Sequence, residues 1–196
     1  DPEAVDWSAL ALWDCRVALS YVPQSSDAVE EVARWPMTSE GRTATLRAYR
    51  LKNPAGPAWL ASAIAVPEET PLEEIVTILS GESFDRRALA VVEGDPLALT
   101  HGVQSSEKRE SDQPTTDSLR VIRAQSGRLW LEVSATAERL LVFSQSYYPG
   151  WRAAVNGRPA PVFPANVAQC AVGLPAGHHT VELRYRPRQF YQGAAV

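Results

Sequence analysis

The sequence lacks a long hydrophobic segment. None of its apolar runs approaches the roughly 18 residues that a membrane-spanning helix requires, so the chain as given contains no candidate span. It also lacks a phosphate-binding glycine loop, a dinucleotide fingerprint and a Gly-x-Ser-x-Gly elbow, which are the signals of nucleotide-binding enzymes and serine hydrolases. A formal net charge of −4 argues against a broad phosphate-binding surface. We therefore expect no nucleic-acid partner.

Cysteine and histidine are scarce as well. For the two cysteines, Cys15 and Cys170, two alternatives stay open: a disulfide that closes a very long loop, or two buried thiols that act as small hydrophobic residues. The three histidines, His101, His178 and His179, do not have the i, i+4 spacing of a helical zinc site. Residues 178 and 179 would point to opposite faces of a strand. We expect no metal and no cofactor.

Apolar residues and turn formers are plentiful. A hydrophobic content of 45% is sufficient for a core, and 15 prolines and 11 glycines favour short strands over a helical bundle. We predict a mainly β protein with three parts. Residues 1–96 form a smaller α+β lobe, 97–118 a flexible polar linker, and 119–196 an antiparallel, jelly-roll-like β-sandwich.

Periodicity and breaker residues give the expected elements of the first lobe. These are a short helix within 1–14, where Trp7, Leu10 and Trp13 have helical spacing, helices over 28–35 and 71–79, and strands over 16–22, 43–51, 59–66 and 88–93. In the second lobe, strands over 119–123, 128–134 and 140–146 are expected to form a meander. Asn156-Gly157 fits a type I′ hairpin turn after a strand over 151–155, and the prolines around Ala160–Phe163 favour an edge strand there. Two further strands are expected over 169–174 and 179–185.

The segment from Leu140 to Tyr191 resembles the C-terminal extracytoplasmic part of YfhO-like bacterial membrane proteins. The residues that carry the resemblance are Tyr147-Tyr148-Pro149-Gly150-Trp151, Asn156-Gly157-Arg158-Pro159, the run from Pro175 to Glu182, Tyr185-Arg186-Pro187, Phe190 and Gly193. Asn156 stands where the pattern more often has Asp. Near Asn53 and Pro54, the arginine of a second family motif is missing, so no role of that guanidinium is carried over.

The resemblance implies a polytopic glycosyltransferase that uses a lipid-linked sugar donor. In that family a final transmembrane helix follows this element, so we expect a soluble fragment of a larger protein, at the extracytoplasmic face of the bacterial cell membrane. The catalytic acids would lie in the membrane domain, and the fragment alone would be non-catalytic. Its expected partners are the membrane domain of the same polypeptide and a cell-envelope glycan or polyprenyl-phosphate sugar.

Candidate ligand-binding residues are Tyr147, Tyr148, Trp151, Arg184 and Arg186. Exposed aromatic rings can stack on sugars, and arginines near a membrane surface can contact lipid phosphate or a polyprenyl-phosphate donor. For Trp151 the alternative is an anchor of the sandwich core, and for the arginines it is a solvated strand face.

No catalytic residue is expected. The acids Glu82, Asp85, Glu93 and Asp95 lie near predicted element ends, where solvated turn residues are the simpler interpretation of them. Two other functional classes stay open: a free-standing carbohydrate-binding module, and a purely structural interaction domain.

Overall fold

The computed structural model describes residues 5–81, 83–94 and 114–187 of the chain. Most of the predicted linker, 97–113, lies outside these ranges. So do His101, Phe190, Gly193 and the acids at 82 and 95. Within the described ranges the protein is mainly β, as predicted.

The chain divides into two compact units, residues 1–57 and 58–196. This boundary differs from the one that the sequence suggested near residue 96. The reason is β4 (Ala58–Val66), which pairs antiparallel with β8 (Arg139–Ser146) and therefore belongs to the second unit. The following helix α2 (Leu72–Ser80) and strand β5 (Leu89–Glu93) belong to that unit too, because β5 pairs parallel to β4.

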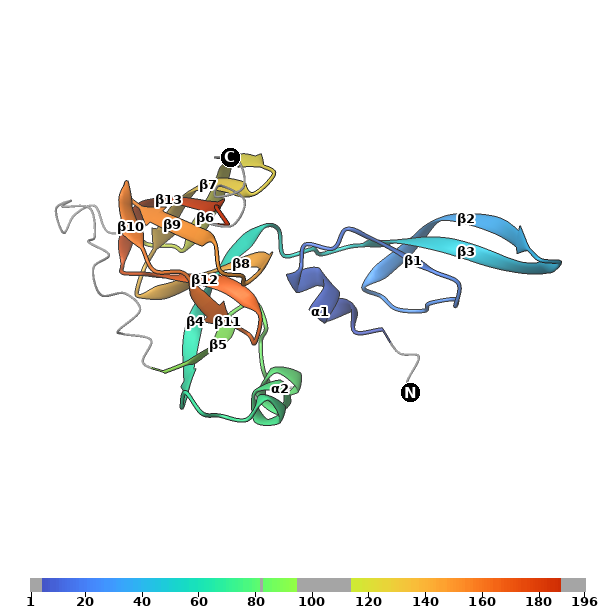
Figure 1. Cartoon of the computed structure of the whole chain (residues 1–196), viewed down its shortest axis with the longest axis horizontal. Helices are drawn as coiled ribbons and strands as arrows, with labels where there is room; N and C mark the ends of the chain where they lie inside the picture. The colour runs from blue at the N-terminus through green and yellow to red at the C-terminus, as the bar shows by residue number, and fades with distance from the viewer. Residues whose placement is uncertain (1–4, 82, 95–113, 188–196) are drawn as a thin grey trace, which may run out of the picture. The chain divides into compact units, whose positions relative to one another are not determined.

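The first unit is a three-stranded antiparallel sheet with one helix, α1 (Trp7–Leu12), at its start. Its strands are β1 (Val17–Ser20), β2 (Val29–Ser39) and β3 (Arg42–Leu51), in the order β1-β3-β2 (Figure 1). The helix begins where the Asp6 carboxylate accepts a hydrogen bond from the Ala9 N–H, which satisfies one of the free donors of the first turn. The Trp7 and Tyr49 rings, with centroids 6.1 Å apart, pack α1 on β3.

The helix expected over 28–35 was wrong, because these residues begin the long strand β2. Register pairing with β3 continues from Val29 to Ser39, with one irregularity near Val32. Pro36 does not interrupt the sheet because β2 is an edge strand and has an unpaired side. Tertiary pairing has overridden a local capping signal.

The face of this sheet that carries Trp35 is apolar and exposed. Trp35 pairs with Leu46 and Met37 with Ala44, so these side chains share a face. Trp35 and Met37 are 46% and 47% exposed, and Leu19 on β1 is 62% exposed. We call this surface the apolar face of the first unit.

The second unit is a sandwich of two five-stranded sheets, which Figure 1 shows as two layers. One sheet has the order β10-β9-β13-β7-β6 and the other β11-β12-β8-β4-β5. The strands not yet introduced are β6 (Ser118–Gln125), β7 (Arg128–Ala135), β9 (Trp151–Val155), β10 (Arg158–Ala160), β11 (Phe163–Ala165), β12 (Gln169–Leu174) and β13 (Gly177–Tyr185).

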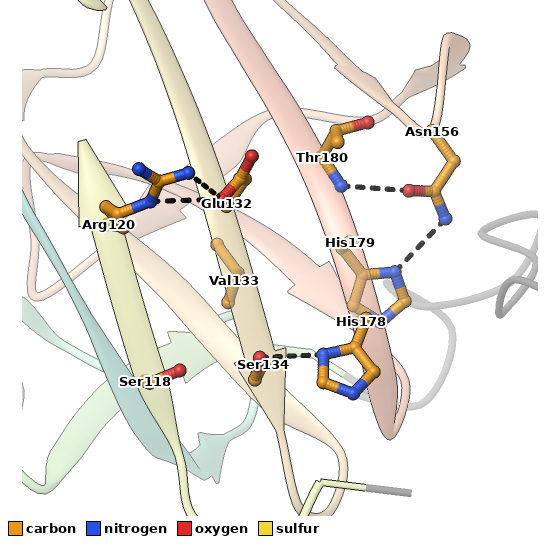
Figure 2. A pocket seen from close by; sticks show the side chains of 9 residues that line it. All are labelled: Ser118, Arg120, Glu132, Val133, Ser134, Asn156, His178, His179 and Thr180. Carbon is orange, nitrogen blue, oxygen red and sulfur yellow. Dashed lines mark hydrogen bonds and ion pairs between the residues drawn. The ribbon is translucent and has the colours of Figure 1, made fainter. Parts of the chain in front are cut away.

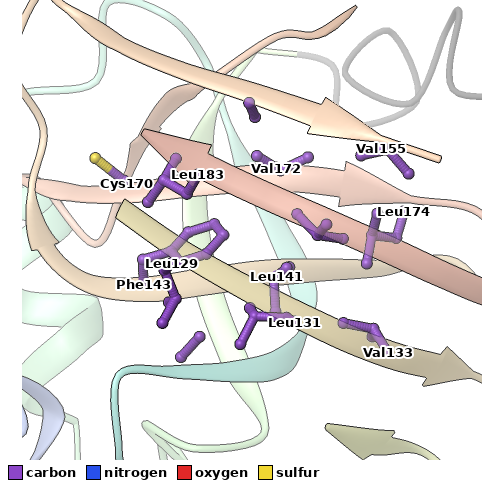
Figure 3. Packing of buried hydrophobic residues seen from close by; sticks show 13 residues of the cluster. Leu129, Leu131, Val133, Leu141, Phe143, Val155, Cys170, Val172, Leu174 and Leu183 are labelled. Atoms are coloured by element: carbon purple, nitrogen blue, oxygen red, sulfur yellow. The ribbon is translucent and has the colours of Figure 1, made fainter. Parts of the chain in front are cut away.

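The main core lies between these sheets (Figure 3). Leu131, Val133 and Leu183 come from one layer and Phe143 and Val172 from the other, and all are almost fully buried. The residues from β7 and β13 are buried because every second residue of these strands faces the core. Phe143 and Val172 lie on β8 and β12, which are buried along most of their length.

Both cysteines are free thiols. Cys170 is fully buried in the sandwich core, and this burial raises the pKa of its thiol to about 12. Cys15 packs at the edge of the smaller cluster in the first unit. Of the two alternatives left open by the sequence, the structure has the unbridged one.

The hairpin turn predicted at Asn156-Gly157 is confirmed. Both residues have positive φ (51° and 78°), and they connect β9 to β10 in a tight hairpin. The single edge strand expected over 160–163 was wrong. The segment instead forms two three-residue edge strands in different sheets, β10 and β11, because the chain crosses between the layers at Pro161 and Val162. The expected meander was also wrong in its third strand, since β8 leaves β7 for the opposite sheet.

Candidate functional site

Many polar and charged side chains of the second unit lie on one side of sheet β10-β9-β13-β7-β6, the side that faces away from the core. We call it the outer face. Its side chains alternate with core residues along each strand, as they must in a sheet buried on one side only. It carries Arg120 on β6, Arg128, Trp130, Glu132 and Ser134 on β7, Arg152 on β9, and His178, Thr180, Glu182 and Arg184 on β13.

A hollow of about 550 Å³ lies at one end of the outer face, and we call it the polar hollow (Figure 2). The Ser134 hydroxyl and His178 Nδ1 meet across β7 and β13 at 2.8 Å. Further along, the Arg120 guanidinium donates to the Glu132 carboxylate at 2.6 and 3.1 Å. The hollow therefore presents a hydroxyl, an imidazole, a carboxylate and a guanidinium within one depression.

Asn156 and His179 line one side of this hollow, where hydrogen bonds hold both side chains. The Asn156 Oδ1 accepts from the Thr180 N–H at 2.9 Å, and its Nδ2 lies 3.2 Å from His179 Nδ1. His179 Nε2 lies 2.9 Å from the Pro175 carbonyl oxygen, which can only accept. The neutral ring with its proton on Nε2 satisfies both contacts, since Nδ1 then accepts from the Asn156 amide. Burial lowers the pKa of His179, which favours this neutral form.

A second, smaller hollow of about 320 Å³ adjoins the first, with Glu132 and Thr180 common to both. Ile122, Trp130 and Ala154 line it. The Trp130 ring is not free for stacking, because the guanidinium carbons of Arg128 and Arg123 lie 4.2 and 5.4 Å from its centroid.

Four of the five candidate residues named from the sequence lie around the start of β9 and the end of β13. Tyr148 is the most exposed at 61%, and Tyr147 is 37% exposed. Trp151 packs partly against the core, and its indole N–H donates to the Ser146 carbonyl at 3.0 Å. Arg186 is exposed just after β13. The fifth residue, Arg184, lies on the outer face.

These motif residues form a compact junction that we call the clasp. The Arg186 N–H donates to the Gly150 carbonyl at 2.7 Å, and the rings of Trp151 and Tyr185 are tilted against each other with centroids 5.0 Å apart. Gly150 has φ +124°, and a Cβ there would lie 3.1 Å from both Pro187 Cα and the Tyr185 ring. Two segments 35 positions apart in sequence thus meet here, and their close approach requires glycine at position 150.

The acids of the outer face are already engaged in ion pairs. Glu132 pairs with Arg120 at 2.6 Å and Glu182 with Arg128 at 2.9 Å. Asp85, one of the acids noted in the sequence, accepts hydrogen bonds from the N–H groups of residues 87 and 88 and so caps a turn. In the described ranges, no group of three or more His, Cys, Asp or Glu side chains is placed to hold a metal ion.

The arrangement suits recognition of hydroxyl-rich ligands better than bond cleavage. Donors and acceptors converge on one open depression, while both neighbouring carboxylates hold arginines.

Neither helix in the described residues is long and apolar enough to cross a bilayer.

Fold and site together define a β-sandwich domain with a polar outer face. A family model for the bacterial membrane protein YfhO matches residues 95–196, slightly more than half of the chain. The chain therefore belongs to the YfhO family of bacterial membrane proteins. No curated protein and no solved structure matched the chain.

The sequence reasoning missed Trp130, Ser134 and Asn156 as site residues. Part of the signal was present, because polar residues at 128, 132 and 134 alternate with apolar residues at 129, 131, 133 and 135, and only the apolar Trp130 departs from this pattern. The alternation does not show which strands lie beside β7. The hollow depends on this strand pairing, so the sequence did not predict it.

Proposed function

We propose that this chain is an extracytoplasmic domain of a membrane glycosyltransferase, inert by itself, that helps to hold an acceptor glycan during cell-envelope glycosylation. The observation that carries the proposal is the polar hollow, where Ser134, His178 and the Arg120–Glu132 pair offer donors and acceptors to sugar hydroxyls. Membership in a membrane-protein family supports a membrane domain of the same polypeptide as the partner.

Binding of soluble oligosaccharides to the 196-residue chain tests this role. We expect saturable binding of hexose or N-acetylhexosamine oligomers by calorimetry, weakened about tenfold or more by Ser134→Ala combined with His178→Ala, because each lost hydrogen bond is worth about 1 kcal/mol. Tyr148→Ala is the matched variant at the exposed turn. If Tyr148→Ala abolishes binding and the double variant does not, the ligand binds at the turn and not in the hollow.

The catalytic part of the proposal has its own test. With a polyprenyl-phosphate sugar as donor and the oligosaccharide as acceptor, the chain is expected to transfer no sugar, because the carboxylates of its outer face are held by arginines. Transfer above the level of a heat-denatured sample would overturn the inert assignment.

The apolar face of the first unit favours a second candidate function, that of an interaction domain. Leu19, Trp35 and Met37 are each about half exposed on one sheet face, and burying them against a partner would be favourable. In the intact protein, Trp35→Ser with Met37→Ser should then lower the thermal stability of the assembled protein in detergent. An unchanged stability would remove this candidate.

A further inference from the structure

Three arginines stand side by side across three neighbouring strands of the outer face. Arg184 of β13 is the register partner of Arg128 on β7 and of Arg152 on β9. Directly paired residues project from the same face, and neighbouring strands lie about 5 Å apart. We call these three residues the arginine row.

Most of the positive charge of this row is uncompensated. Arg128 donates to the Glu182 carboxylate at 2.9 Å. Within the part of the chain that the structure describes, the hydrogen bond of the Arg152 guanidinium goes to a neutral acceptor, the Trp151 carbonyl oxygen, at 3.3 Å. Among the described residues, no carboxylate pairs with Arg152 or Arg184. Like charges placed directly opposite each other in a sheet are destabilising, so the row works against the fold unless an external anion binds it.

Elsewhere on the same face, the fold compensates one arginine with a carboxylate. Arg120 is the register partner of Glu132, and the two form a close ion pair. The chain carries a net charge of −4, so a local excess of positive charge does not follow from its composition. The row is therefore a specific concentration of charge in an acidic chain.

Basic and apolar groups continue beyond the row. Arg123 lies over the Trp130 ring, Ile122 is 48% exposed, and Arg186 is exposed after the end of β13. None of the three row residues lines the polar hollow or its smaller neighbour. Arg128 and Arg152 are exposed and Arg184 is half-buried, so the row can meet several anionic groups at once.

We propose that the arginine row docks this domain on the phosphate groups of an anionic bilayer surface. An extended row on an open face complements a plane of lipid phosphates, to which each nearby arginine contributes about 1 kcal/mol of attraction. The chain belongs to a family of membrane proteins, so such a surface is within reach of the domain. Docking in this way orients the adjacent polar hollow beside the lipid headgroups.

Vesicle co-sedimentation of the 196-residue chain tests the proposal. We expect binding to phosphatidylcholine vesicles that contain about one third phosphatidylglycerol, little binding to pure phosphatidylcholine, and release by salt. Arg152→Gln with Arg184→Gln should weaken the binding by about 25-fold, which is about fivefold for each charge removed. Arg34→Gln with Arg42→Gln removes the same charge from exposed positions of the first unit and should leave the binding within about twofold of wild type.

A second readout guards against a folding defect. Because Arg152 and Arg184 repel each other and have no carboxylate partner among the described residues, their double variant should melt at the same temperature as wild type or higher. Equal binding to neutral and anionic vesicles, or full binding by the double variant, would overturn the proposal. It would also fail if inorganic phosphate bound the row tightly while anionic vesicles did not. The glycan-hollow variants Ser134→Ala and His178→Ala should keep vesicle binding, so this proposal and the proposed function can fail separately.

Discussion

At the scale of single residues, Asn156 connects the hairpin turn to the wall of the polar hollow. Its amide accepts from the Thr180 N–H and donates toward His179 Nδ1, while its own φ is positive. An aspartate could make the first contact but would face the unprotonated Nδ1 of a neutral imidazole. Asparagine is thus the residue that fits a neutral His179.

Asn156→Asp is expected to change the pH dependence of stability. In the folded wild-type protein the pKa of His179 is below 6.5. The neutral His179 therefore stabilises the fold fully above pH 6.5. This stabilisation is lost as the pH falls, because the unfolded chain takes up the proton more readily than the folded chain. The new carboxylate would raise that pKa. We expect a loss of about 1 kcal/mol at pH 8 that shrinks by about pH 5.5, measured by urea unfolding. A constant loss at both values would contradict the coupling to His179.

Asp117 provides a second residue with a defined effect of pH. It accepts from the Thr136 N–H and hydroxyl, both at 2.7 Å, and from Arg139 at 2.8 Å. The Thr136 backbone hydrogen bond leads the contacts that lower its pKa from 3.8 to about 2, against the opposing effect of burial. Because the folded pKa is depressed, its stabilisation is present above pH 3.8 and is lost as the pH falls through about 2.

Asp117→Asn should therefore cost about 1 kcal/mol at neutral pH and progressively less between about pH 4 and pH 2. Urea denaturation across this range measures the difference. Glu138→Gln, at an exposed carboxylate in the neighbouring turn, is the control and should have little effect. A pH-independent cost for Asp117→Asn would show that shape and not charge holds this turn.

Sequence reasoning at this scale succeeded where local chemistry decides the outcome. The positive φ of Asn156 and Gly157 follows from the dipeptide itself. Trp130 was missed because its role depends on Arg123, which comes beside it only through pairing of β6 with β7. The ligand roles of Tyr147, Tyr148, Trp151, Arg184 and Arg186 stay predictions.

At the scale of elements, the clasp explains why the most recognisable motif residues occur together. Gly150 allows the backbone of Pro187 to approach, and the Trp151–Tyr185 contact closes the junction between β9 and β13. The presence of these residues together in this chain thus has a structural cause. It does not by itself require a ligand.

Gly150→Ala is expected to destabilise the second unit by about 2 kcal/mol or more, because its φ is unfavourable for alanine and the Cβ would lie 3.1 Å from Pro187 Cα. Gly157→Ala is the matched control, since Gly157 also has positive φ but nothing lies within 4 Å of a Cβ there. The difference between the two variants in thermal or urea unfolding measures the close contact together with the less favourable φ of Gly150, +124° against +78°. Equal losses would mean that backbone conformation alone requires Gly150.

Element types were predicted well where periodicity was long, as in β3, β7 and β13. The helix predicted over 28–35 was wrong because the capping signal and the proline favour a helix only where no neighbouring strand pairs with the segment. Here β3 pairs with it. The strands β10 and β11 could not be assigned to different sheets from sequence, since the crossing depends on where the second layer lies.

At the scale of the whole molecule, the two units have very different cores. The first is centred on Trp7, Val29, Tyr49 and Leu51, whereas the second buries residues from two complete sheets. The sequence showed a polar stretch but did not locate the structural boundary, which lies between residues 57 and 58. The cause is that β4 and β5 precede that stretch and yet complete a sheet with strands that follow it.

Hydrogen exchange should reveal this difference in core size. We expect the amides of β2 and β3 to exchange markedly faster than those of β8 and β12, because the smaller cluster gives less protection against local unfolding. Mass spectrometry of peptides from the 196-residue chain measures both sets at once. Equal protection in the two units would show that they unfold together.

The hairpin turn also affects the rate at which Asn156 deamidates. In an Asn-Gly pair, attack of the glycine nitrogen on the asparagine side-chain amide is unhindered, and it releases ammonia through a cyclic imide. In the folded chain, the hydrogen bonds to Thr180 and His179 hold the Asn156 amide away from that path. We expect deamidation at this position to be slow in the native protein and fast after denaturation, so that the fraction of aspartate and isoaspartate at residue 156 records how long a sample has spent unfolded.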